Sequence, residues 1–294
     1  MIVVEFLLRA LSGGGLPWFV GHECRAGFIS LVSRLDPELG SLLHEGLGVS
    51  VGKRKAVFSL RPLRFVSGFK VVFPERPSRF LIDGNVVFSP EAQATLGVTF
   101  FNDDLAGKLL MKLLSEIQTL KISIKGYEFH VERLSFEVVN PRELINSKDE
   151  SEWVDIEFVT PTYFNPLHGD SKYKVLYPDP TLMLASLIST SHQLTSVDYP
   201  KPEELASMIY VSGLDIKTPL IREMQKEAPT GFVGWVKLRF KDEASSETRR
   251  KIIGLLKLGE LTNVGGNRSG GYGVIKLKLK QEEQTQPIET EKPN

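Results

Sequence analysis

A histidine and three cations stand close together in the first part of this sequence. His44 ends an apolar stretch, and Lys53, Arg54 and Lys55 follow shortly after it. Histidine can act as a general acid or base near neutral pH, and cations stabilise the charge that develops on phosphorus oxygens. Attack of an RNA 2′-hydroxyl on its own phosphate needs these groups in in-line geometry, and it needs no metal. The pattern indicates a site that acts on a phosphodiester. The alternative is that His44 is only a surface residue at a helix end and that the three cations are only the solvated edge of a strand.

A second group of reactive side chains comes earlier in the chain. His22, Glu23, Cys24 and Arg25 are consecutive and could substitute for the His44 site, although the polarity of a helix start explains them equally well. The five histidines of the chain include no HExxH or other compact metal spacing, and GxSxG is absent. We therefore expect neither a metal nor a cofactor.

A glycine-rich loop at 265–273 is a candidate ligand site. It has five glycines in nine residues, so its backbone can adopt positive φ and lie close to a ligand, with amides that can cradle phosphate oxygens. Arg268 suits phosphate and Tyr272 suits a base. The predicted contacts are Gly265, Gly266, Asn267, Arg268, Ser269, Gly271, Tyr272 and Gly273. The alternative is that the loop only connects two elements as a hairpin. A dinucleotide-binding fingerprint is excluded, because that motif is followed by a helix and this loop is followed by a strand.

The composition is that of a globular protein, with 41% hydrophobic and 24% charged residues. The apolar run at the N-terminus is too short to span a bilayer. The single cysteine, Cys24, excludes an intramolecular disulfide, so we expect a cytoplasmic protein. The net charge is zero, but residues 281–294 carry four glutamates and one lysine. We expect this acidic tail to be disordered and the remaining chain to be modestly basic, which permits nucleic-acid binding.

Hydrophobic periodicity predicts the same order of elements twice. In residues 1–140 we expect strands at 1–9, 56–63, 64–73, 85–89, 120–124 and 128–138, a loop at 13–15, and helices at 23–34, after Asp36-Pro37 and at 103–117. In residues 153–280 we expect strands at 153–159, 208–219, 231–240 and 273–279, and helices at 180–194 and 245–258. Residues 141–152 read as a linker. This pattern predicts an α+β fold of two tandem ferredoxin-like (βαββαβ) domains with antiparallel sheets.

These segments resemble the CRISPR-associated repeat-processing endoribonucleases of the repeat-associated mysterious protein (RAMP) superfamily. The similarity is most specific at 231–236, 255–260 and 264–274, where Gly271-Tyr272-Gly273 ends a glycine-rich loop before the last strand. Residues 27–45 are also similar to the first-domain helix and histidine region of that family. The resemblance implies tandem ferredoxin-like domains and metal-independent cleavage of CRISPR repeat RNA, with 2′,3′-cyclic phosphate and 5′-hydroxyl products.

The resemblance also implies roles for particular residues. His44 matches the general acid or base, and Lys53, Arg54 or Lys55 matches a phosphate-stabilising lysine, with the choice among the three left open. Ser30 stands where some members have a tyrosine, and Asn263 stands at the first glycine of the usual loop. The implied partner is repeat RNA, with other CRISPR effector subunits as further candidates and either a monomer or a homodimer. A non-catalytic repeat-RNA-binding subunit and a ferredoxin-like scaffold protein remain the alternative functions.

Overall fold

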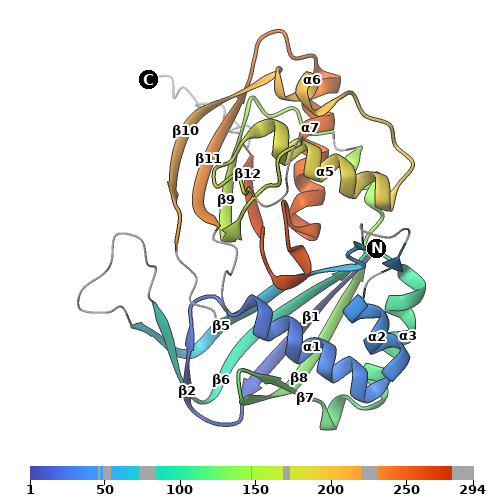
Figure 1. Ribbon diagram of the computed structural model, residues 1–294, viewed down its shortest axis with the longest axis vertical. Helices are drawn as coiled ribbons and strands as arrows, with labels where there is room; N and C mark the ends of the chain where they lie inside the picture. Colours follow the sequence, from blue (N-terminus) through green and yellow to red (C-terminus); the bar gives the residue numbers. More distant parts are fainter. Residues whose placement is uncertain are drawn as a thin grey trace, which may run out of the picture.

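The computed structural model describes residues 1–45, 47–48, 54–72, 84–146, 148–167, 173–219 and 231–279. The predicted acidic tail and Lys53 lie outside these residues. Two lobes are stacked along the longest axis of the molecule (Figure 1). Each lobe has its own hydrophobic core, one built from residues between Ile2 and Val131 and the other from residues between Val154 and Ile275.

The first lobe is an antiparallel sheet with helices on one face. β1 (Ile2–Ala10) lies between β6 (Asn85–Phe100) and β8 (Tyr127–Val138). The other strands of this sheet are β2 (Gly14–Pro17) and β5 (Phe58–Val72), both on β6, and β7 (Lys121–Ile124), on β8. The helices are α1 (Gly21–Leu35), α2 (Pro37–Glu45) and α3 (Asp103–Ser115), followed by the short η1 (Ile117–Thr119). Alternate β1 residues are fully buried beneath the helices, and Phe6 packs edge-on against Phe28 of α1.

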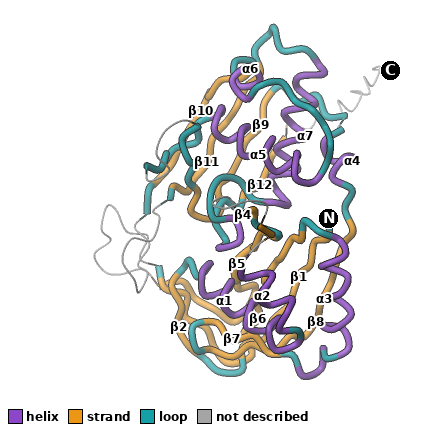
Figure 2. The backbone as a smooth tube through the Cα atoms, turned by 45° about the vertical axis from the view of Figure 1, so that its right-hand side comes forward, coloured by secondary structure: helices purple, strands orange, loops and turns teal. Residues whose placement is uncertain are grey.

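The second lobe repeats this arrangement. Its sheet has the order β10 (Ile209–Lys217), β11 (Phe232–Phe240), β9 (Trp153–Thr162), β12 (Ile275–Leu279), with every pair antiparallel. The helices are α5 (Pro180–Leu194), α6 (Pro202–Ala206) and α7 (Ser246–Thr262). Figure 2 shows α5 and α7 on one side of this sheet. Phe232, Val236 and Leu238 of β11 are buried on that side, whereas Trp235 is exposed on the other.

Both lobes have the βαββαβ order and the strand order of a ferredoxin-like domain, so the predicted fold class is confirmed. In the first lobe the six elements are β1, α1, β5, β6, α3 and β8; in the second they are β9, α5, β10, β11, α7 and β12. The additional elements are insertions between these six. No helix among the described residues is long and apolar enough to cross a membrane.

The strand predictions around β5 and β6 are too short. The strands predicted at 56–63 and 64–73 are one strand, β5, and the strand predicted at 85–89 continues to Phe100 in β6. Proline and glycine at positions 62 and 68 suggest a break, but among the described residues β5 pairs with β6 alone, and it accommodates them through register shifts between Arg61 and Phe69. Proline is tolerated at such irregular positions on edge strands, where its missing N–H costs no ladder bond.

Two further segments differ from the sequence prediction. Of the loop expected at 13–15, Gly14 and Gly15 belong to β2, which pairs with residues 85–88 of β6. The expected linker at 141–152 begins with a short helix, α4 (Pro141–Ile145), whose first amide donates to the side chain of Asn140. Ile145 of α4 is buried, and its backbone lies directly against Gly254 of α7, where there is no room for a side chain. This segment therefore packs against the second lobe.

Candidate active site and nucleic-acid interface

His44, the histidine predicted to act as a general acid or base, lies at the end of α2. The helix begins as predicted, because the Asp36 carboxylate accepts the Leu39 amide at 3.0 Å and Pro37 occupies the first turn. Leu39 and Leu43 are buried in the first core, which fixes one face of the helix. His44 follows Leu43 in the last turn and is exposed. Its ring is therefore accessible to a substrate.

Arg25 of α1 holds this end of α2 in place. Its Nη2 donates to the main-chain carbonyl of His44 at 3.3 Å. A cation at the carbonyl end of a helix satisfies an unpaired acceptor and stabilises the helix dipole. Arg25 is half-buried, and this burial lowers the pKa of its guanidinium from the usual value. Residues 22–25, which the sequence suggested as a substitute for the His44 site, thus include Arg25, which positions His44.

Ser30 and the basic run are placed less directly. Ser30 is exposed on α1, one turn before Ser33, which lies against Gly40 of α2. Two short strands follow α2, β3 (Leu47–Gly48) and β4 (Arg54–Lys55), and their backbones pair. This pairing returns the backbone of the basic run to a position just beyond His44. Lys53 and the side chains of Arg54 and Lys55 lie outside the described residues.

The glycine-rich loop is folded inward, and most of its amides already donate to protein groups. The Gly265 amide donates to the Ser186 hydroxyl at 2.8 Å, and the Gly266 amide donates to the Tyr163 carbonyl at 3.0 Å. The four amides of 270–273 donate to the carbonyls of Asn267, Arg268, Asn267 again and Pro161. These six amides are therefore not available to phosphate in this arrangement, contrary to the prediction from composition.

Tyr272 is also buried. Its ring is fully inaccessible and packs against Phe19 at 5.0 Å, His22 at 5.7 Å and Tyr163 at 5.8 Å between ring centroids. Because Phe19 and His22 belong to the first lobe, the Tyr272 ring lies at the junction of the two lobes. It cannot stack on a base here, which corrects the prediction for this residue.

Arg268 is likewise a junction residue. It belongs to the short η2 (Arg268–Gly270), and its guanidinium lies 5.4 Å from the ring centre of Phe101 in the first lobe. It also donates to the Thr190 hydroxyl of α5. Burial lowers the pKa of Arg268 to about 10. Arg268, which was predicted to bind phosphate, is thus largely enclosed by protein.

The loop nevertheless lies beside the elements of the candidate active site. Gly270 and Gly271 pack against Gly21 at the start of α1, where a side chain would collide with the Gly270 carbonyl. The Asn267 amide is 3.2 Å from His22 Nε2, one turn before Arg25. The structure thus brings together the loop, the first turns of α1 and the end of α2. Cys24, in the same turns, is buried, and desolvation raises the pKa of its thiol to about 12, so it is no nucleophile.

A cleft of about 520 Å³ between the lobes was not identified from the sequence. It is lined by Glu5, Arg61 and Arg64 of the first sheet and by Glu260 and Lys276 of the second lobe, among others. Arg61 donates to the Glu260 carbonyl, and burial lowers the pKa of Arg61 and raises that of the Glu260 carboxyl. The only sequence signal was the presence of arginines within a strand, and their partners lie far along the chain.

Comparisons with known proteins can be set against this geometry. Residues 156–275 match the family model described as "CRISPR-associated endoribonuclease Cas6". A search of curated proteins gives no match. Thermus thermophilus Cas6 (TTHB231) superposes with a TM-score of 0.63 and 20% identity over 95% of this chain and 98% of that chain. A Cas6 (TTHA0078) substrate-mimic complex has a TM-score of 0.61 and 18% identity over 95% of this chain and 100% of that chain.

A more distant structural relative is similar over nearly its whole length. The product of a Cas6-related gene from Pyrococcus furiosus has a TM-score of 0.55 and 12% identity over 96% of this chain and 99% of that chain. The second lobe thus has the sequence pattern of the CRISPR-associated endoribonuclease Cas6 family, the whole chain has the Cas6 fold, and the resemblance found in the sequence is confirmed.

Proposed function

We propose that this chain binds CRISPR repeat RNA and cleaves it within each repeat by metal-independent transesterification. The observation that carries the proposal is the exposed His44 at the end of α2, held through its carbonyl by Arg25 of α1. The match of the second lobe to an endoribonuclease family supports RNA cleavage as the class of activity. A product complex of Cas6 (TTHB231), with a TM-score of 0.65, and a "RAMP protein binding different RNA substrates", with a TM-score of 0.57, support the substrate class.

In the proposed reaction the 2′-oxygen attacks the adjacent phosphorus. A base removes the 2′-hydroxyl proton, the new O2′–P bond forms, and the P–O5′ bond breaks as the 5′-oxygen takes up a proton. The products carry a 2′,3′-cyclic phosphate and a 5′-hydroxyl. His44 acts as the general acid or base, and a cation from the run Lys53–Lys55 stabilises the charge on the phosphorane oxygens. Ser30, which is exposed on α1, stays a candidate site residue, and we assign it no particular step in this reaction.

Cleavage of repeat RNA in EDTA tests this proposal. We expect wild type to cleave and His44→Ala to lose about 10²- to 10⁴-fold in rate, the usual contribution of general acid–base catalysis. His130→Ala is the matched control, because His130 lies on β8 and has no proposed role. Mass spectrometry should identify the cyclic phosphate.

Two results would contradict the proposal. Full activity of His44→Ala would remove the role of His44, and an absolute requirement for Mg²⁺ would remove the mechanism. Salt-sensitive binding of repeat RNA without any cleavage product would instead favour the alternative of a non-catalytic RNA-binding subunit.

A further inference from the structure

The second sheet has an open face that combines an exposed aromatic ring with cations. On β11, residues facing the helices are buried, and those facing away include Trp235 and Lys237. Trp235 is 41% exposed, so one face of its indole is accessible to a ligand. Gly213 on the neighbouring strand makes room for the ring, because a side-chain carbon at that position would lie 3.1 Å from it. The indole can therefore lie across the surface of the sheet.

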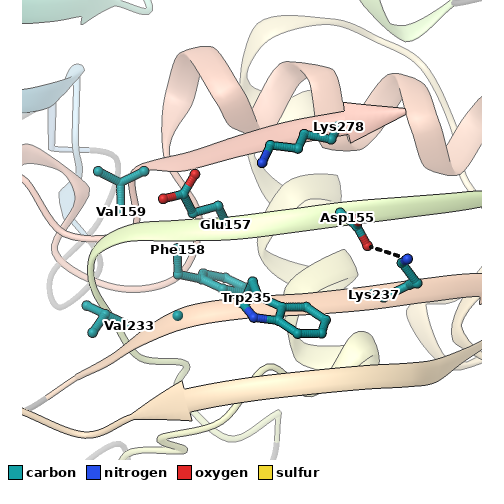
Figure 3. A pocket seen from close by; sticks show the side chains of 9 residues that line it. Asp155, Glu157, Phe158, Val159, Val233, Trp235, Lys237 and Lys278 are labelled. Carbon is teal, nitrogen blue, oxygen red and sulfur yellow. Dashed lines mark ion pairs between the residues drawn. The ribbon is translucent and has the colours of Figure 1, made fainter. Parts of the chain in front are cut away.

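A hollow surrounds this ring. It has a volume of about 630 Å³ and takes residues from β9, β11 and β12 (Figure 3). Its apolar lining includes Trp235, Phe158, Val159 and Val233, and its charged lining comes from side chains of β9, β11 and β12. Its volume lies within the range of sites for small organic ligands, which suits the base and sugar of a nucleotide.

The charges around the hollow favour a nucleic acid. The outward cations of β11 and β12 are Lys237, Arg239, Lys276 and Lys278, and the outward carboxylates of β9 are Asp155 and Glu157. Lys237 is already paired with Asp155 at 3.6 Å and lies 4.3 Å from the ring centre of Trp153, whereas Lys278 reaches the hollow from β12 (Figure 3). Cations beside an exposed aromatic are the usual surface for single-stranded RNA. The carboxylates can accept hydrogen bonds from base amino groups.

The hollow lies beside the cleft between the lobes. Val159 lines both of them. Lys276 lines the cleft and Lys278 lines the hollow, and the two lysines are successive outward-facing residues of β12. Arg64 of the first sheet lines the far side of the cleft, together with the carboxylates Glu5 and Glu260. A strand of RNA can therefore pass from Lys278 and Lys276 on the second sheet towards Arg64 in the cleft.

We propose that Trp235 stacks on a base of a single-stranded RNA segment whose backbone lies along Lys278 and Lys276. This inference rests on the proposed function for the identity of the RNA. It adds a binding site on the helix-free face of the second sheet, away from His44 on the helix-covered side of the first. The expected ligand is unpaired RNA, because a paired base has no free face for the indole.

The test is equilibrium binding of non-cleavable repeat RNA, which has a 2′-deoxy nucleotide at the scissile position. We expect Trp235→Ala to weaken binding about 5- to 150-fold and Trp235→Phe to restore most of the affinity, since stacking contributes about that much per base. Phe136→Ala is the matched control, because Phe136 on β8 is an aromatic that is 51% exposed, somewhat more than Trp235. Lys278→Gln should reduce the slope of log affinity against log salt by about 0.7, and Trp235→Ala should leave the slope unchanged.

Competition identifies the kind of RNA. A short single-stranded RNA should displace the bound repeat RNA from wild type and should do so poorly from Trp235→Ala, whereas duplex RNA of the same length should show no such difference. Binding by Trp235→Ala that equals that of wild type would overturn the inference, and so would an equal loss in Phe136→Ala. The readout is separate from cleavage: a wild type that binds through Trp235 but cuts nothing would overturn the proposed reaction and leave this site standing.

Discussion

Asn263 has a backbone conformation that only glycine normally adopts. Its φ of 60° and ψ of 167° place it in a sparsely populated region, where a residue with a side chain costs about 1–3 kcal/mol. The fully buried side chain offsets this strain: its Nδ2 donates to the Leu60 carbonyl in the first lobe at 2.9 Å and to the Tyr272 carbonyl at 3.0 Å. One amide group thus ties the end of α7, the glycine-rich loop and the first lobe together.

Two substitutions separate the strain from the hydrogen bonds. Asn263→Ala keeps the strained backbone and leaves the Leu60 and Tyr272 carbonyls without this donor, which costs about 1–3 kcal/mol for each buried group. Asn263→Gly loses the same bonds but removes the strain, so its free energy of unfolding should exceed that of the alanine variant by about 1–3 kcal/mol. Urea unfolding followed by circular dichroism measures the difference. Equal stability of the two variants would show that the strain is not stored at this residue.

Single residues were predictable from the sequence only where the reasoning was local. The placement of His44 after Leu43 at the end of a capped helix follows from periodicity and from Asp36-Pro37. The burial of Tyr272 does not, because glycines predict a flexible backbone and say nothing about Phe19, which is supplied by the other lobe. The same holds for Trp235, since alternation predicts that it faces away from Val236 but not that helices leave that face open.

At the scale of elements, α2 depends on Asp36, the residue that precedes it. The Asp36 carboxylate caps the helix through the Leu39 amide and pairs with Lys112 of α3 at 2.8 Å. The hydrogen bond from Lys112, followed by that from Leu39, lowers the pKa of Asp36 below its usual value. A carboxyl with a lowered folded-state pKa adds stability above its unfolded pKa and loses it as the pH falls through the folded pKa.

The link between the lowered pKa of Asp36 and the stability of the protein can be tested by substitution. Asp36→Asn keeps a capping oxygen but removes the charge, so it should be less stable than wild type near neutral pH. The difference should shrink as the pH falls below about 3.9, the ordinary aspartate value, and should disappear once Asp36 itself is protonated. Urea unfolding across this range measures it, and Lys112→Gln should show the same convergence. A difference that stays constant with pH would mean that the charge of Asp36 adds no stability.

Most helices and strands could be predicted from the sequence. The ones that were missed depend on neighbours that are distant in the sequence. The core strands and the long helices bury one face each, so their periods of two and 3.6 residues appear in the sequence. β5 could not be predicted as one strand because Pro62 and Gly68 are turn signals, and only its position at the edge of the sheet allows them inside it. α4 was hidden in a polar stretch, because the glycine that admits it, Gly254, lies on α7.

At the scale of the whole molecule, the glycine-rich loop joins the lobes. Gln193 of α5 donates to the Ala56 carbonyl at 3.0 Å, just before β5, and Asn263 at the end of α7 donates to the Leu60 carbonyl within β5, so two helices of the second lobe contact this part of the first. The loop adds the aromatic contacts of Tyr272 and the stacking of Arg268 on Phe101. The RNA track proposed above crosses this junction, so its geometry depends on how firmly the lobes are held.

In the part of the chain that the structure describes, Tyr272 is the largest fully buried side chain, and it lies between the lobes, so its removal should uncouple them. Replacing a buried aromatic by alanine costs about 3–5 kcal/mol, and here that cost falls on the junction and leaves both cores intact. We expect one calorimetric unfolding transition in wild type and in Tyr272→Phe, which keeps the ring, but two in Tyr272→Ala. A single transition in Tyr272→Ala would mean that the hydrogen bonds of Asn263 and Gln193 suffice to couple the lobes, and the loop would then be a connection without a role in holding them.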